Sequence, residues 1–262
     1  MSLKETKDFW NASPCGGNQE LKERRLQRYR MEPWIPGILR KIAGRHSNIL
    51  EVGCGQGTDA LTICSELNQN GKYVGVDYSD ESVAIANKTA TELAPELNVY
   101  PIFKVGNAEN LGEFENESIE CIFSLGVLHH TNDENKAIEE IYRILEPGGK
   151  AYIWLYRKWS PKVGLAKLLR FIQSCLDKIL GTERCLYKAL YGRHFESLLG
   201  TMILECFGVP YMKWYGQNSL KNMFSGFNLL SLEPMGGNIP WISGKEHGRN
   251  MFGYFWAIEI QK

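Results

Sequence analysis

Strand-like and helix-like segments alternate between residues 47 and 156, and this alternation limits the fold more than any other feature of the chain. The helix-like segments carry apolar residues at helical spacing, and the last one ends in Pro-Gly-Gly. Because a helix between two strands lets both run the same way, the pattern predicts a parallel sheet with helices on both faces. The expected strands span 47–53, 72–78, 98–105, 119–126 and 149–156, and the expected helices span 58–70, 79–94 and 132–149.

Two more strand-like segments, 227–234 and 251–260, lie near the C-terminus with no periodic helix between them. They predict an antiparallel hairpin that closes one edge of the sheet. The chain is therefore expected to comprise an N-terminal arm (1–46), a ligand-binding core (47–159), an inserted helical cap (160–216), and a C-terminal helix and strand pair that complete the core (217–262).

The expected cap would lie over the carboxyl ends of the strands, where open α/β sheets bind ligands. Its first segment, 161–180, is amphipathic, which predicts a helix that packs its apolar stripe on the domain. That stripe consists of Leu165, Leu168, Leu169, Ile172, Cys175, Leu176 and Ile179. Membrane-surface binding is the weaker interpretation, because the stripe is short and the chain is neutral.

The composition is that of an ordinary folded protein, with 44% hydrophobic and 23% charged residues. The 30 basic and 30 acidic residues give no sign of a polyanionic partner, so no nucleic acid is expected. The seven cysteines are scattered and contain no C-x-x-C pair, which favours a reduced, cytoplasmic setting. The N-terminus lacks a secretion signal and no apolar run approaches ~18 residues, so no stable membrane association is expected.

The first expected strand leads into a glycine-rich turn, Gly53-Cys54-Gly55-Gln56-Gly57. The dinucleotide fingerprint is G-x-G-x-x-G, but here the third glycine comes one place early and Thr58 follows it. The chain also lacks a G-x-x-x-x-G-K-[ST] sequence. An NAD-linked oxidoreductase would share the sheet, but the glycine spacing opposes it.

Polar residues after the next two strands favour a nucleoside as the ligand. Asp77 ends the second strand, where a carboxylate can accept hydrogen bonds from both hydroxyls of a ribose. Asn107, Ala108 and Glu109 follow the third strand and offer an amide and backbone groups to the edge of a purine.

The ordered segments ILEVGCGQG, VGVDYS, GNAENL, SLGVLHH and LEPGG resemble the class I S-adenosylmethionine-dependent methyltransferases over about 47–156, with a weaker likeness at 227–260. The resemblance implies a Rossmann-like seven-stranded sheet of order 3-2-1-4-5-7-6 with strand 7 antiparallel, and S-adenosylmethionine as cofactor. Gly53 and Gly55 would let the backbone approach the methionine part, and Glu51 would favour its amino group. The implied cofactor-binding residues are Tyr29, Glu51, Gly53, Cys54, Gly55, Asp77, Tyr78, Asn107, Ala108, Glu109, Leu125 and Gly126. The family usually has Asp in place of Asn107.

Residues 8–17 and 24–36 resemble the arm of bacterial and archaeal small-molecule methyltransferases of the UbiE-like type, in which a helix covers the cofactor. Tyr29 is then the candidate for the methionine carboxylate and Trp10 for a lid; alternatively, both simply pack the arm on the core. Acidic residues are interspersed with the basic cluster Lys22, Arg24, Arg25, Arg28 and Arg30, which predicts a solvated helix face.

The implied reaction transfers a methyl group to an O, N or C atom of a small or medium organic acceptor. His129 and His130 follow the fourth strand and are the candidate catalytic residues, since a histidine titrates near working pH. Alternatively, they help to cap a helix that begins near Thr131, with Glu134 completing a T-x-x-E box. Aromatic side chains are expected to line the acceptor cleft: Trp159, Phe195, Trp214 and Tyr215.

Other functions remain open. A non-catalytic S-adenosylmethionine-binding protein would keep the cofactor residues and lack an acceptor pocket. Arsenite could be methylated through Cys175, Cys185 and Cys206, although cysteines in helices and strands are usually inert. No metal is expected, because no histidine, carboxylate or cysteine pair shows ligand spacing.

Overall fold

The computed structural model describes residues 3–12, 20–190, 207–209, 212–237 and 249–262. Seven strands form one sheet of order β3-β2-β1-β4-β5-β7-β6. β7 runs antiparallel to both of its neighbours, and the other pairings are parallel. The expected fold class and strand order are therefore confirmed. The strands are β1 (Asn48–Val52), β2 (Lys72–Asp77), β3 (Ile102–Val105), β4 (Ile119–Leu125), β5 (Leu145–Tyr156), β6 (Asn228–Met235) and β7 (Phe255–Gln261).

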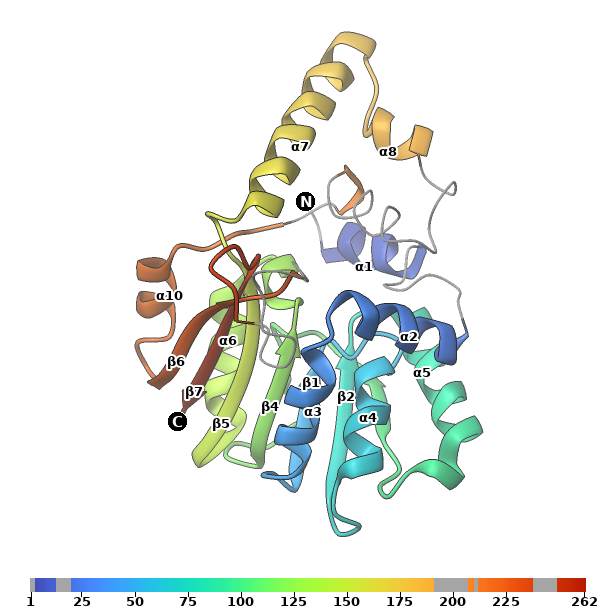
Figure 1. The fold of residues 1–262 in the computed structure, drawn as a ribbon, viewed down its shortest axis with the longest axis vertical. Helices are drawn as coiled ribbons and strands as arrows, with labels where there is room; N and C mark the ends of the chain where they lie inside the picture. The colour runs from blue at the N-terminus through green and yellow to red at the C-terminus, as the bar shows by residue number, and fades with distance from the viewer. Residues whose placement is uncertain (1–2, 13–19, 191–206, 210–211, 238–248) are drawn as a thin grey trace.

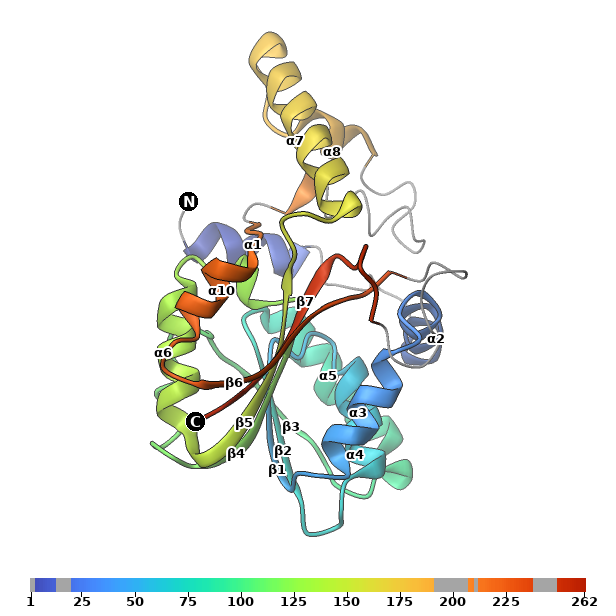
Figure 2. The ribbon, with the colours of Figure 1, turned by 60° about the vertical axis from the view of Figure 1, so that its left-hand side comes forward.

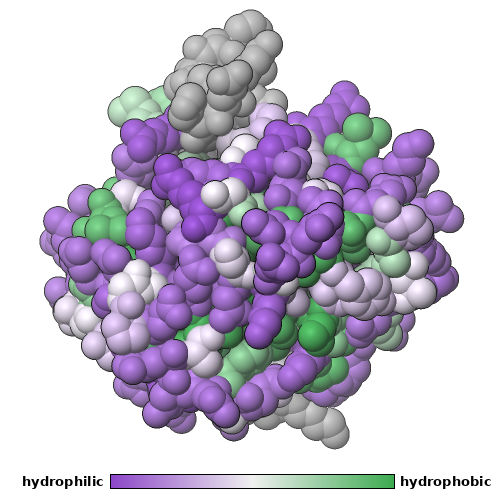
Figure 3. All heavy atoms as spheres, turned by 90° about the horizontal axis from the view of Figure 1, so that it is seen from below, coloured by the Kyte–Doolittle hydropathy of each residue, from purple (hydrophilic) through white to green (hydrophobic). Residues whose placement is uncertain are grey.

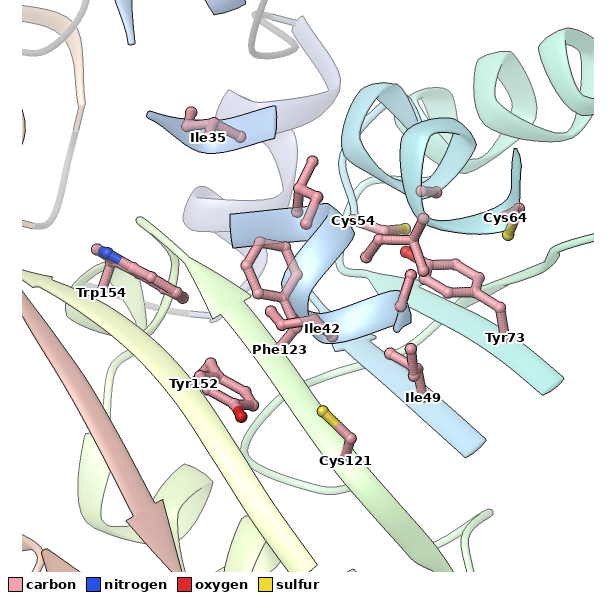
Figure 4. Packing of buried hydrophobic residues seen from close by; sticks show 14 of the residues in the cluster. Ile35, Ile42, Ile49, Cys54, Cys64, Tyr73, Cys121, Phe123, Tyr152 and Trp154 are labelled. Atoms are coloured by element: carbon pink, nitrogen blue, oxygen red, sulfur yellow. The ribbon is translucent and has the colours of Figure 1, made fainter. Parts of the chain in front are cut away.

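Helices cover both faces of the sheet, as Figure 2 shows most clearly. One face is covered by α3 (Ile35–Ala43), α4 (Thr58–Glu66) and α5 (Asp80–Leu93), and the other by α6 (Glu134–Ile144) and α10 (Gln217–Met223). Each layer encloses its own hydrophobic core. In Figure 4, Ile42 of α3 lies near Phe123 of β4, and Cys54 and Cys64 lie near Tyr73 of β2. The strand ends that carry polar residues are thus held between two packed layers.

The helix expected at 132–149 is α6, and it ends earlier than the Pro-Gly-Gly sequence predicts. α6 stops at Ile144, and Leu145 already has an extended backbone. The Pro147-Gly148-Gly149 segment belongs to the start of β5, where the register with β4 shifts between Ile119 and Cys121. The glycines therefore serve an irregular strand start, because Gly148 has a positive φ of 83°.

The N-terminal arm contains α1 (Leu3–Ala12), α2 (Leu21–Met31) and α3. α3 is part of the core, since Ile35, Leu39 and Ile42 are fully buried. α1 lies across the carboxyl end of the sheet in Figure 1, where Lys7 pairs with Asp80 at 2.8 Å. The opposite end of the molecule, shown in Figure 3, is mainly hydrophilic.

The insertion begins with α7 (Pro161–Leu180) and α8 (Cys185–Leu190), which project beyond the carboxyl end of the sheet (Figure 1). Its base is closed by backbone hydrogen bonds from Lys158 N to Tyr215 O (2.9 Å) and from Tyr215 N to Tyr156 O (2.8 Å). No helix of the described residues is long and apolar enough to cross a membrane.

The expected packing of α7 is wrong. Leu165, Leu168, Ile172, Cys175 and Ile179 are exposed, and Leu169 and Leu176 are only partly buried. The buried residues of the helix are Val163, Ala166 and Gln173. α7 leaves the sheet end and packs this other face against α8 and Phe207, where Gln173 Nε2 donates to Phe207 O at 3.0 Å.

Candidate active site

The three glycines of the turn after β1 all have positive φ, but they have different surroundings. A Cβ on Gly53 would come within 2.2 Å of Val127 Cγ2, and one on Gly57 within 2.9 Å of Phe103 Cζ. A Cβ on Gly55 would meet nothing within 4 Å. Gly53 and Gly57 are therefore required for close packing inside the protein, and Gly55 faces open space.

Cys54 lies within this turn but is not a reactive thiol. Its side chain is buried, and its Sγ lies 3.7 Å from Gly55 O. Burial, followed by the negative charges of Asp77 and Glu51, holds the pKa of the Cys54 thiol well above its ordinary value. The neutral thiol is a packing group, and its backbone N–H donates to Val76 O at 3.0 Å.

Asp77 braces the glycine turn from the end of β2. Its Oδ2 accepts from Gly55 N–H at 2.8 Å and its Oδ1 accepts from Ser79 N–H at 2.9 Å. Burial raises the pKa of Asp77, and the backbone hydrogen bonds oppose this shift. Each carboxylate oxygen keeps a further lone pair, and the side chain is partly exposed, so Asp77 can still accept from ligand hydroxyls. Beside it, the Tyr78 ring centroid lies 5.7 Å from Lys7 Nζ of α1.

Glu51 of β1 is buried, and the charge of Asp59 on α4 acts on it. Tyr73 donates its hydroxyl hydrogen bond to Glu51 Oε2. Burial, reinforced by the nearby charge of Asp59, raises the pKa of Glu51 to about 8. The carboxyl group is therefore mostly protonated at neutral pH, although the charge of Arg28 already opposes the shift.

Two arginines of α2 bind the first turn of α4, although this face of α2 was expected to be solvated. Arg24 is buried, and its guanidinium donates to Thr58 Oγ1 at 2.8 Å and to Gln56 O at 3.2 Å. Arg28 pairs with the buried Asp59, with Nε 2.8 Å from Oδ1. The interpretation of these two residues as solvated is wrong. Their spacing of four residues was the available signal, because it places both on one helix face.

Tyr29 lies on the same helix and contacts α4. Its hydroxyl is 2.7 Å from Thr62 Oγ1 and 3.4 Å from Thr58 O. Burial and the charge of Asp59 hold the pKa of Tyr29 above its ordinary value. The structure thus places the Tyr29 hydroxyl beside the glycine turn, but with protein partners of its own.

The polar turn after β3 is tied together by its own side chains. Asn107 Oδ1 accepts from Glu109 N–H at 3.0 Å, and Ala108 between them is buried. Glu109 Oε1 accepts from Asn132 N–H at 2.7 Å, which links this turn to the loop before α6. In this turn, Asn107 can still offer a ligand its side-chain amide group and the second lone pair of Oδ1.

β4 ends at Leu125, and Gly126 turns the chain with a positive φ of 78°. Gly126 N–H donates to Trp154 O at 3.1 Å. The next residue, Val127, packs against Gly53, so the loop after β4 adjoins the glycine turn.

His129 belongs to the short 3-10 helix η2 (Leu128–His130) and is fully buried at 0% exposure. Neither ring nitrogen has a hydrogen-bond partner among the described residues. Its ring centroid lies 4.0 Å from that of Tyr156 and 4.1 Å from that of His130. Burial, followed by the charges of His130 and Lys162, holds the pKa of His129 well below its ordinary value. The imidazole is therefore neutral and retains an unused acceptor nitrogen.

Only some of the expected aromatic side chains lie near the histidine pair. The Trp10 ring on α1 lies 5.3 Å from the His130 ring, so the arm reaches the histidine pair. Tyr215 is buried, and Lys167 Nζ lies 4.4 Å from the ring centroid of the partly buried Trp214. Trp159 is largely exposed and does not line a cleft, whereas Phe195 is outside the described residues.

The expected T-x-x-E capping box is wrong. The N-cap of α6 is Asp133, whose side chain accepts from Asn135 N–H at 3.2 Å and from Lys136 N–H at 3.4 Å. Thr131 Oγ1 donates backward to Leu128 O at 2.6 Å, and Glu134 pairs with Lys213. Asp133 caps the helix because it directly precedes the first helical residue, Glu134, so its side chain can accept from backbone N–H groups of the first turn.

These residues fit an adenosyl cofactor in three respects. The turn leaves open space at Gly55, Asp77 has acceptor capacity beside it, and Glu51 can ionise for an ammonium group. Within the described ranges, no group of three or more His, Cys, Asp or Glu could hold a metal ion.

Comparisons with known proteins show to which family the chain belongs. The family model described as a methyltransferase domain matches residues 44–198. An arsenite methyltransferase of Aquipseudomonas alcaligenes is 31% identical over 156 residues, which are 57% of this chain and 42% of that protein. The ubiquinone/menaquinone biosynthesis C-methyltransferase UbiE of Rickettsia typhi is 31% identical over 119 residues, which are 45% and 47% of the two chains. The match thus spans less than half the length of these relatives.

The fold also has close counterparts among solved structures. Magnesium protoporphyrin IX methyltransferase from Synechocystis PCC 6803, solved with bound SAH, matches with a TM-score of 0.62 at 14% identity over 100% of both chains. A match of this identity shows the fold. Because the family model covers more than half of the chain, this protein belongs to the methyltransferase domain family and is a member of the class I S-adenosylmethionine-dependent methyltransferases.

Proposed function

We propose that this protein transfers a methyl group from S-adenosylmethionine to an O, N or C atom of a small or medium organic acceptor. The observation that carries the proposal is the juxtaposition of two features. The glycine turn opens at Gly55 and is braced by Asp77, and the loop that packs on Gly53 holds the buried His129, whose ring nitrogens have no hydrogen-bond partner among the described residues. The named relatives methylate arsenite or act in quinone biosynthesis, which supports a small acceptor.

The cofactor would be held by the strand ends. Asp77 would accept from the ribose hydroxyls, Glu51 would pair with the amino group, and Asn107 would face the adenine. Arg24 and Arg28 would act indirectly by fixing the first turn of α4. We assign the remaining contacts to Tyr29, Gly53, Cys54, Gly55, Tyr78, Ala108, Glu109, Leu125 and Gly126.

When bound, the cofactor supplies a methyl group on a positively charged sulfur, which is already reactive. The protein therefore acts mainly by aligning the acceptor with that group. His129 would take the proton of a hydroxyl or amino acceptor at its free nitrogen, because its depressed pKa keeps it unprotonated. His130 and Trp10 would close the acceptor side and exclude water.

We also retain the division into arm, core, cap and C-terminal segment, and we propose that the arm and residues 160–216 determine the choice of acceptor. The mixture of basic and acidic residues in this insertion supports an organic acceptor over a nucleic acid. We place the protein in the cytoplasm on its cysteine usage. Arsenite has weaker support, because Cys175 lies on the exposed face of α7 and Cys206 is outside the described residues.

His129→Asn is expected to lower kcat by at least about 100-fold with an acceptor found by screening metabolites for S-adenosylhomocysteine release, because a general base contributes on this order. Calorimetry should show unchanged affinity for S-adenosylhomocysteine. His130→Asn is the matched control and should lose much less activity, since His130 already has contacts of its own. Full activity of folded His129→Asn would reject the role of His129, and an absence of release with every acceptor would count against methyl transfer.

Cofactor binding is expected to release a proton near neutral pH. The ammonium group favours ionised Glu51, so its pKa must fall from about 8 on binding, and affinity should rise as the pH rises toward 8. Calorimetry of S-adenosylhomocysteine in buffers with different ionisation enthalpies measures this release. Glu51→Gln should bind more weakly and release no proton. An equal release from wild type and Glu51→Gln would show that another group titrates.

A further inference from the structure

The outward face of α7 carries a continuous apolar stripe. Leu168 is 55% exposed, Phe171 66% and Ile179 78%. At 3.6 residues per turn these positions share one side of the helix, opposite the buried Ala166 and Gln173. The stripe consists of Leu165, Leu168, Phe171, Ile172, Cys175 and Ile179, all of them exposed.

This apolar surface is not explained by packing within the described part of the protein. The opposite face of α7 already makes the contacts of the insertion, with Arg170 donating to Val209 O at 2.8 Å and Gln173 to Phe207 O at 3.0 Å. Exposing several large side chains in a row has a cost, so a contiguous stripe of this kind marks an interaction surface.

The segment that carries the stripe is basic. Residues 158–180 contain five basic side chains and one acidic side chain, although the whole chain is neutral. The single acid, Asp177, caps the next segment by accepting from Arg184 N–H and Cys185 N–H, both at 2.8 Å. Lys167 and Lys178 lie about three turns apart and therefore flank the same edge of the stripe.

We propose that α7 docks on an anionic lipid surface, with its apolar stripe in the headgroup region and its lysines at the lipid phosphates. Charge complementarity selects this occupant over a second copy of the chain, because two copies would bring like-charged helices together. α7 would lie along the surface and not span it, since its other face carries the buried Gln173 and packs on protein. The inference does not depend on methyl transfer.

This proposal revises the expectation of no stable membrane association. That expectation assumed that the stripe packs on the domain and that the neutral charge of the chain applies locally. The structure exposes the stripe, and the segment 158–180 that carries it has five basic residues and one acidic residue.

Flotation of the full chain with vesicles tests the proposal. Vesicles of phosphatidylcholine with about one third phosphatidylserine should carry the protein, and vesicles of phosphatidylcholine alone should carry much less, because nearby lysines contribute at an anionic surface. Phe171→Gln/Ile179→Gln should lower the partition coefficient at least about tenfold, since two large apolar side chains lose their burial. Lys178→Glu should lower it several-fold, and added salt should do the same.

Leu26→Gln is the matched control, because Leu26 is an equally exposed leucine on α2, and it should leave flotation unchanged. Circular dichroism should show the same melting temperature for all variants, since the replaced side chains are exposed. Failure of the wild type to float with anionic vesicles would overturn the proposal, as would equal flotation of Phe171→Gln/Ile179→Gln. A dimer in light scattering that this variant dissociates, without vesicle binding by the wild type, would assign the stripe to a second copy instead.

Discussion

Gly53→Ala is expected to destabilise the protein by about 2–6 kcal/mol, because it adds left-handed backbone strain to an overpacked contact, each costing about 1–3 kcal/mol. Gly53 has a φ of 84°, and the new Cβ would come within 2.2 Å of Val127 Cγ2. Val127 cannot move away easily, since it lies between β4 and the buried His129. Urea denaturation of the two proteins measures the difference.

Gly55→Ala is the matched control for this substitution. Its φ of 51° is also positive, but the added Cβ meets nothing within 4 Å, so the cost should be only about 1–2 kcal/mol. Val127→Ala combined with Gly53→Ala should recover only part of the packing loss, because the Cβ of residue 127 would still lie 2.8 Å from the new Cβ. Equal stabilities of Gly53→Ala and Gly55→Ala would contradict the different roles given to the two glycines.

Asp77→Ala is expected to weaken S-adenosylhomocysteine binding about 10-fold to 150-fold, because a hydrogen bond to a charged group contributes about 1.5–3 kcal/mol. The substitution also releases Gly55 N–H and Ser79 N–H, which Asp77 holds at 2.8 and 2.9 Å. The lost hydrogen bond to the ribose and the loosened glycine turn both weaken binding, since the turn must be ordered to bind the cofactor. Calorimetric titration of the folded variant gives the change in Kd.

Two further variants separate these effects. Asp77→Asn keeps one carbonyl oxygen and should bind more tightly than Asp77→Ala but less tightly than the wild type. Glu92→Ala removes an exposed carboxylate of α5 that pairs with Lys88 at 3.9 Å, and it should leave the Kd unchanged. An unchanged Kd for folded Asp77→Ala would show that Asp77 does not hold the ribose.

Most of the sheet could be predicted because its signals are local. Buried parallel strands have short apolar runs, and each was followed by a helical period or a turn. The glycine turn and Asp77 were likewise visible, and the structure joins them through the hydrogen bond from Gly55 N–H to Asp77. The strand order itself came from the family resemblance, since local periodicity does not determine which strands are neighbours.

Local pattern could place Arg24 and Arg28 on one face of α2 and the apolar residues on one face of α7, but it could not predict what these faces contact. Arg28 is solvated in a helical projection of α2 alone, and only the fold brings it to Asp59, which lies 31 residues later. In the same way, the stripe of α7 has the period of a packed helix, and periodicity shows that an apolar face exists without showing what covers it. Local pattern also does not show that the His129 ring lacks a hydrogen-bond partner among the described residues. Its surroundings depend on distant elements, since Tyr156 of β5 forms part of them.

The glycine turn and Asp77 are expected to bind an adenosyl cofactor that carries no phosphate. Calorimetric titration of the wild-type protein with S-adenosylhomocysteine and, separately, with NAD tests this most directly. We expect saturable binding of S-adenosylhomocysteine at one site per chain and no comparable binding of NAD. Tight binding of NAD with no response to S-adenosylhomocysteine would show that the turn holds a dinucleotide instead.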